Sequence, residues 1–187
     1  GGGEQSNYYL SLTYLDNDGI VKGKDDVYQR MTATINAEYN IKPWLKVGTT
    51  NQIEKYNTRG VSTQNAYGSF LQSVLMMDPL TPDTYAPDKL PAHMQNALNQ
   101  GSTLLQDENG NYYASSLFYE GENYHPTVMR KSTIGRNSGF NVNGSIYADF
   151  TPIKGFTFTS RFGYRLGGTR SANTSLPFYG NSTQRRD

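Results

Sequence analysis

The sequence predicts an all-β fold, an antiparallel meander of long hairpins. Apolar and polar residues alternate strictly along residues 31–41, which is typical of a strand with one apolar face. Four further segments alternate in a similar way, and the connections between them are short and long in a regular order. Strands in soluble domains average about five or six residues, so strands of this length need an explanation of their own.

The first two predicted strands cover residues 7–14 and 28–41. In both, every second side chain is apolar and the side chains between them are mostly polar or tyrosine. Their apolar faces carry Leu10, Leu12, Met31 and Ile35.

Three more strands follow along the chain. Residues 45–56 begin with the same alternation but lose it at Asn51, whereas residues 140–150 keep it throughout. In the last strand, residues 156–165, only Ser160 interrupts the apolar face. The large apolar side chains at the middle of this last face are Phe158 and Phe162.

The connections alternate in length. Residues 42–43 and 151–155 form two tight turns with the proline and glycine chemistry of hairpins. Residues 15–26 and 57–138 form long connections, so short turns fall at one end of the sheet and long loops at the other. The DNDG stretch within the first long connection fails the spacing of a calcium loop, and we expect a polar turn there.

The longest connection must have structure of its own, because a loop of that length without structure is unusual. Helical spacing predicts a short helix over residues 66–77, and a second helix is possible over residues 91–98. The sequence therefore predicts three parts: barrel strands one to three, an extracellular loop insertion, and barrel strands four and five with the start of the next loop. Their boundaries are residues 1–56, 57–138 and 139–187.

The predicted strand length fits a membrane. A strand of about fourteen residues rises roughly 46 Å, and a tilt of about 45° leaves roughly 33 Å, close to the hydrocarbon thickness of a bilayer. One face has no charged residue, whereas the other face is polar and charged. This pattern predicts an excised segment of a transmembrane β-barrel, with lipid outside and water inside. The predicted lipid-facing residues are Leu10, Leu12, Met31, Ile35, Phe158 and Phe162.

Composition excludes several functions. The net charge of +1 gives no electrostatic support for binding nucleic acid, and the absence of cysteine excludes disulfides and thiolate metal sites. His93 and His125 are the only histidines, too few and too scattered for a metal or hydrolytic triad. We therefore expect no catalytic residue, no metal and no cofactor. The start GGGEQSN lacks an initiating methionine, and we expect the chain to be part of a larger protein.

Three stretches resemble a known family. They are YYLSLTYLDNDGIV, YQRMTATINAEY followed by WLKVG, and NGSIYADFTPIKGFTFTSRFGYR, and DPLTPDTYAPD adds a proline-rich loop. Together they resemble barrel segments of the SusC/RagA family of TonB-linked outer-membrane transporters. The motifs are structural, and residues 81–138 match only loosely.

The resemblance implies a large plugged barrel in the bacterial outer membrane that imports oligosaccharides or peptides. Its partners would be a surface lipoprotein of the SusD type, which acts as a lid, and the TonB system. The segment alone would not transport. Its exposed apolar face predicts that the isolated piece self-associates or folds its insertion over that face.

Tyrosines in the insertion provide the alternative function. Residues 107–124 predict a turn followed by an aromatic strand, and aromatic rings suit the apolar surfaces of sugars. Such residues more often form the small core of a folded loop. If they do bind sugar, a secreted carbohydrate-binding β-sandwich would be the alternative to a barrel segment, recognised by short strands and two apolar faces packed together. The possible stacking residues are Tyr112, Tyr113, Tyr119 and Tyr124.

Overall fold

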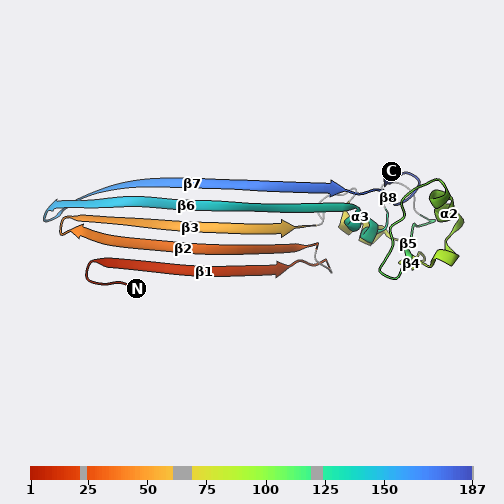
Figure 1. Cartoon of the computed structure of the whole chain (residues 1–187), viewed down its shortest axis with the longest axis horizontal. Helices are drawn as coiled ribbons and strands as arrows, with labels where there is room; N and C mark the ends of the chain where they lie inside the picture. The colour runs from red at the N-terminus through yellow and green to blue at the C-terminus, as the bar shows by residue number, and fades with distance from the viewer. Residues whose placement is uncertain (22–24, 61–68, 119–123, 187) are drawn as a thin grey trace. The chain divides into compact units, whose positions relative to one another are not determined.

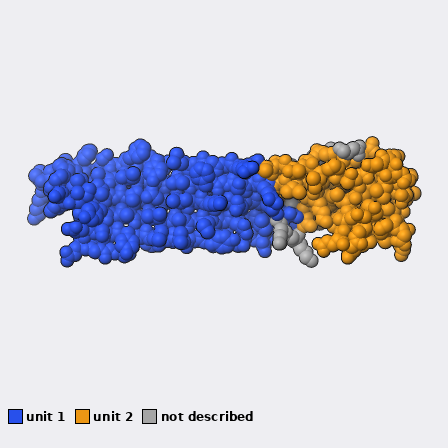
Figure 2. All heavy atoms as spheres, in the orientation of Figure 1, with its two compact units in different colours: residues 1–59, 136–171 blue, residues 60–135, 172–187 orange. Residues whose placement is uncertain are grey.

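The chain folds into two compact units, which we describe separately. The computed structural model describes residues 1–21, 25–60, 69–118 and 124–186. Unit 1 comprises Gly1–Arg59 and Arg136–Ser171, and unit 2 comprises Gly60–Gly135 and Ala172–Asp187 (Figure 2). No helix among the described residues is both long enough and apolar enough to cross a membrane.

Unit 1 is built on a single five-stranded sheet. The strand order is β1-β2-β3-β6-β7, and the pairs β1–β2, β2–β3 and β3–β6 are antiparallel (Figure 1). The predicted antiparallel meander is therefore confirmed. The strands are β1 (Ser6–Asp18), β2 (Val27–Lys42), β3 (Leu45–Arg59), β6 (Thr133–Ile153) and β7 (Phe156–Ser175).

These strands are longer than the alternation predicted, ranging from 13 residues in β1 to 21 in β6. The DNDG stretch was predicted as a turn, and this was wrong for its first three residues. β1 continues through Asp18, which lies opposite Val27, and the Gly19 N–H donates to the Asp26 carbonyl at 2.7 Å. The strand continues because its partner strand supplies backbone hydrogen bonds that outweigh the turn preference of Asp and Asn.

Two tight turns join the paired strands of the sheet. Pro43 and Trp44 connect β2 to β3, and Lys154 and Gly155 connect β6 to β7. Gly155 has φ of 87°, a left-handed conformation that glycine adopts without steric cost. Both turns join the predicted strands, but Lys42 and residues 151–153, which were predicted as turn residues, continue β2 and β6.

Unit 2 contains short elements around a small core. The core cluster consists of Met94, Ala97, Leu104 and Tyr179, and the Tyr179 N–H donates to the Thr103 carbonyl at 2.7 Å. Residues after β7 therefore share a core with the long insertion. The elements are α1 (Phe70–Met76), β4 (Thr84–Tyr85), η1 (Pro87–Lys89), α2 (Ala92–Asn99), β5 (Tyr112–Tyr113), α3 (Pro126–Ser132), β8 (Phe178–Tyr179) and β9 (Arg185–Arg186).

The helices of unit 2 begin at recognisable signals. The Ser69 side chain caps α1 by accepting a hydrogen bond from the Gln72 N–H at 3.1 Å, and Pro91 directly precedes α2. These helices occupy the two predicted helical stretches, although residues 66–68 of the first lie outside the described residues. The third helix, α3, was not predicted. Pro126 occupies its first turn and His125 caps it.

Candidate functional site

The candidate functional surface is the sheet of unit 1, whose two faces differ in chemistry. Directly opposed residues of neighbouring strands share a face. Leu10 lies opposite Ile35, and Tyr14 lies opposite Met31. Leu12, two positions from Leu10, keeps 73% of its surface exposed. The structure thus places the predicted residues of β1 and β2 on one face, which we call the apolar face.

The same face continues across the other three strands. Asn51 of β3 lies opposite Ile35 of β2 and opposite Gly144 of β6. The Tyr164 ring of β7 closely approaches Gly144, so the even-numbered residues of β7 belong to this face. The predicted residues two and six positions before Tyr164 are Phe162 and Phe158. All six predicted residues lie exposed on one face, and their contact with lipid stays a prediction.

The apolar face has the height of a membrane band. On β6 it runs from Phe140 to Phe150, about 33 Å along the strand and roughly 25 Å along a barrel axis at a tilt of about 40°. Phe150 packs edge-on against Trp44 beside the short turns, with ring centroids 5.4 Å apart. Aromatic residues at the edge of such a band are typical of membrane barrels.

A polar cluster explains why the alternation fails at Asn51. The Asn51 amide donates to the Thr49 hydroxyl at 2.8 Å, and the Thr49 hydroxyl donates to the Ser145 carbonyl at 3.1 Å. The Tyr164 hydroxyl donates to the Asn51 side-chain oxygen. A side chain at Gly144 would clash with both Asn51 and Tyr164, so glycine leaves the room that this contact needs. The cluster satisfies its own hydrogen bonds within the apolar face. The prediction that this face has no charged residue was wrong, because strand pairing also places Lys55 and Arg170 on it, at one end.

The opposite face of the sheet, which we call the polar face, carries a network of charged side chains. Arg30 of β2 pairs with Glu54 of β3 at 3.6 Å, and the Asn141 amide of β6 donates to Glu54 at 3.0 Å. These contacts connect three strands through side chains as well as backbone. Glu54 is part-buried, so its two partners satisfy a carboxylate that is partly shielded from water.

A second network lies nearer the short turns. Lys46 pairs with Glu38 at 3.2 Å, and the Tyr147 hydroxyl donates to the same carboxylate. The Arg161 guanidinium lies over the Tyr147 ring, 5.0 Å from its centroid. The network therefore crosses β2, β3, β6 and β7. A surface of this kind suits an aqueous lumen and not hydrocarbon, where unpaired charges are costly.

The predicted sugar-stacking tyrosines are engaged inside unit 2. Tyr112 packs against the core, and the Tyr113 ring lies 5.4 Å from the His125 ring and under the Lys131 ammonium at 4.8 Å. Tyr124 stacks on Phe178 with centroids 5.0 Å apart. Tyr119 lies outside the described residues. These contacts are those of a small folded core, and binding of sugar stays a prediction.

His125 is the most buried titratable side chain of this core, at 4% exposure. Burial lowers the pKa of His125, although the Asp83 carboxylate at 3.0 Å acts in the opposite direction. The Asp83 side chain is 77% exposed, so water screens its charge. The neutral His125 ring accepts a hydrogen bond from the Thr127 N–H at 3.2 Å, which caps α3.

Asp78 organises the chain after α1. It accepts hydrogen bonds from the Ser116 hydroxyl, from the Thr81 hydroxyl at 2.8 Å and from the Leu80 N–H at 3.1 Å. The Ser116 hydrogen bond is the main reason why the pKa of Asp78 lies below its ordinary value. Asp78 is therefore a structural carboxylate that holds two segments of unit 2 together.

Unit 2 also exposes large apolar side chains. On and after α1, Leu75 and Leu80 are each about three-quarters exposed, and Leu117 and Phe118 are exposed in a loop. The Ser116 hydroxyl donates to Asp78, which brings the loop of Leu117 and Phe118 near the segment that carries Leu80. Neighbouring exposed apolar residues are typical of surfaces that contact another protein. No pattern in the sequence marks these residues as exposed.

Among the described residues, neither a metal centre nor a sandwich fold fits the structure. Within them, no group of three or more histidine, aspartate or glutamate side chains could hold a metal ion. The sandwich alternative requires short strands, whereas those of unit 1 contain at least 13 residues and keep their apolar face exposed. The structure therefore favours the barrel interpretation over the sandwich.

Comparison with known proteins adds independent support. No protein-family model matches the chain. A TonB-dependent receptor, P39 of Formosa agariphila, is 28% identical over 184 residues, which is 95% of this chain. The solved RagAB peptide transporter matches 95% of the chain with a TM-score of 0.63 and 23% identity. The open-open state of the RagAB peptide importer matches 94% with a TM-score of 0.63 and 22% identity.

These matches decide the fold. The chain resembles a RagA-type barrel segment. The predicted resemblance to the SusC/RagA family is thereby confirmed, as is the predicted fold class. The chain spans 16% of the length of the Formosa receptor and 18% of the matched transporter chain, so it corresponds to a small part of each.

Proposed function

We propose that this RagA-type segment forms part of the wall of an outer-membrane, TonB-dependent importer in bacteria. The observation that carries the proposal is the apolar face of unit 1, which is about as tall as a membrane band and is backed by a charged, cross-linked polar face. The apolar face would meet lipid and the polar face would line the lumen. The segment has too few strands to close, so transport would require the rest of the parent barrel.

We further propose that the cargo is an oligosaccharide or a peptide and that the segment catalyses no reaction. The similarity to peptide transporters supports a peptide. Energy would come from the TonB system, contacted by other parts of the parent protein. Unit 2 would lie outside the cell, because long connections of such barrels face outward.

The exposed apolar residues of unit 2 are suited to contact with a lid protein. Leu75, Leu80, Leu117 and Phe118 would be covered by a surface lipoprotein of the SusD type. Their exposure in the chain alone is consistent with a partner that is bound only in the assembled importer.

Neighbouring residues of β7 provide a sharp test of the membrane assignment. Phe162 lies on the apolar face, and Gly163 lies on the polar face with open space around it, its nearest atom at 3.9 Å. Phe162→Cys and Gly163→Cys would be labelled with a small fluorophore in the parent barrel, in a cysteine-free background. Lipids with brominated tails should quench the label at residue 162 and spare the label at residue 163. Equal quenching at both positions would overturn the proposal.

A further inference from the structure

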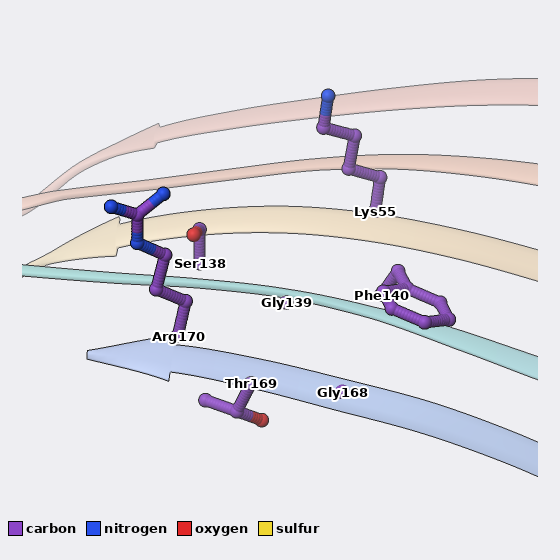
Figure 3. A pocket seen from close by; sticks show the side chains of 7 residues that line it. All are labelled: Lys55, Ser138, Gly139, Phe140, Gly168, Thr169 and Arg170. Atoms are coloured by element: carbon purple, nitrogen blue, oxygen red, sulfur yellow. The ribbon is translucent and has the colours of Figure 1, made fainter.

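Two basic side chains interrupt the apolar face at the end where the long connections lie. Lys55 of β3 lies opposite Met31 of β2 and opposite Phe140 of β6, so it stands in an apolar row. Arg170 of β7 lies two positions beyond Gly168, where a side chain would touch the Phe140 ring. Figure 3 shows Lys55 and Arg170 on strands to either side of the one that carries Phe140.

This position is the boundary of the apolar band. The next row beyond Lys55 is polar, because Asn57 lies opposite both Gln29 and Ser138. In Figure 3 the Arg170 side chain extends from β7 toward Ser138. Long basic side chains at such a boundary lay their stems on apolar surface and hold their charges at the level of lipid headgroups.

The charges of these two side chains lack partners within the described part of the chain. Neither Lys55 nor Arg170 forms a salt bridge there, and both are exposed. They line a shallow hollow of about 510 Å³ whose described lining contains no acidic residue. The acidic residues Asp16 and Asp18 line a neighbouring hollow that shares Ser138 with the first and contains two arginines of its own, Arg59 and Arg136. Among the described residues that line it, the first hollow carries two positive charges and no acidic side chain, beside an aromatic ring.

We infer that this hollow binds the phosphate-bearing headgroup of a lipid in the outer leaflet. The inference rests on the proposed function, since it requires the apolar face to meet lipid. An acyl chain would lie along the apolar face below Phe140, and the phosphate would be held between Lys55 and Arg170 by charge-assisted hydrogen bonds. Charge complementarity selects a phosphorylated lipid over a neutral one.

The test measures lipid retained by the parent barrel. The barrel would be reconstituted in nanodiscs of neutral lipid doped with a diphosphorylated outer-membrane glycolipid, and bound glycolipid would be counted by native mass spectrometry. Lys55→Gln with Arg170→Gln should weaken retention about 25-fold, roughly fivefold for each charge removed. With the dephosphorylated glycolipid, the double variant and the unchanged protein should retain equal amounts.

A matched control separates the possible failures. Arg165→Gln removes a charge from the polar face of the same strand and should leave retention unchanged. If the double variant retains the phosphorylated lipid as well as the unchanged protein, or if loss of phosphate makes no difference, the inference fails. Quenching of the labelled Phe162→Cys variant is measured in parallel, in nanodiscs that contain brominated lipid. If that label is quenched but retention does not change, the membrane assignment holds and the lipid site is wrong. Absence of that quenching overturns both.

Discussion

Unit 1 and unit 2 differ in where their large apolar side chains lie: unit 2 buries a cluster of them, whereas unit 1 exposes them on one face of its sheet. In unit 2, Met94 and Ala97 are buried in a cluster with Leu104 and Tyr179 of the same unit. In unit 1, large apolar residues such as Leu12 and Phe162 are exposed, and strand pairing with polar-face contacts holds the sheet together. Unit 2 therefore provides its own core, whereas unit 1 depends on surroundings that cover one of its faces.

The strongest consequence of this difference concerns the isolated chain. Without lipid or detergent, the 187-residue chain should form assemblies well above its 20.9 kDa monomer mass in light scattering, because the apolar face is large and uncovered. Leu12→Ser with Phe162→Ser should reduce that association. Thr13→Ser with Thr159→Ser, on the polar face, should not. A clean monomer of the unchanged chain would contradict the contrast between the two units.

Truncation of a core side chain of unit 2 should destabilise that unit alone. Met94→Ala leaves a cavity in the cluster with Ala97, Leu104 and Tyr179, and should destabilise unit 2 by about 2–5 kcal/mol. The slowest-exchanging amides of unit 2 would report this loss in hydrogen exchange, with those of unit 1 unchanged. Leu80→Ala, at an exposed position, should cost less than about 0.5 kcal/mol. Equal losses from both substitutions would show that unit 2 has no core of its own.

Gly144 allows the packing of the sheet in unit 1 to be tested in the same way. Gly144→Ala forces a methyl group against Asn51 and Tyr164, and should destabilise the barrel by about 1–3 kcal/mol in urea unfolding. Gly163→Ala is the matched control, since its new methyl group meets open space. If the control is as damaging as Gly144→Ala, strand flexibility and not the polar cluster sets the cost.

Acid should act on unit 2 before it acts on unit 1. The folded state holds the pKa of His125 below its ordinary value of 6.5, so the unfolded chain binds more protons as the pH falls through that value. The stability of unit 2 is therefore full above about pH 6.5 and declines below it, by less than the core deletion costs. Hydrogen exchange at pH 7.5 and 5.5 measures the decline, and His125→Gln should flatten it. The hydrogen bonds that lower the pKa of Asp78 stabilise unit 2 above the ordinary value of 3.8, and this contribution is lost only in stronger acid.

The sequence predicted those parts of the fold whose causes are local. Alternation along residues 31–41 reports a strand directly, because side chains of a strand point to opposite faces, and Pro43 and Gly155 mark turns by their own backbone preferences. The polar residue Asn51 interrupts the alternation, and its role could not be predicted because its hydrogen-bond partner, Tyr164, lies far along the chain.

Other failures have similar physical causes. The residues of DNDG favour a turn, but the first three of them pair with β2 and continue the strand instead. No local feature of the sequence indicates that pairing. Tyr179 joins the core of the insertion through contacts more than seventy positions away in sequence. The helix after His125 was detectable from Pro126, since proline is over-represented at the first position of helices. The sequence contains Lys55 and Arg170, but only the strand register shows that both lie on the apolar face.

The shared core of unit 2 sets an order of assembly. Tyr179 follows β7, whereas the residues that it packs against belong to the insertion that precedes β6. A nascent chain that ends before Tyr179 therefore lacks one member of the cluster, and unit 2 can complete its core only after both long strands have been synthesised.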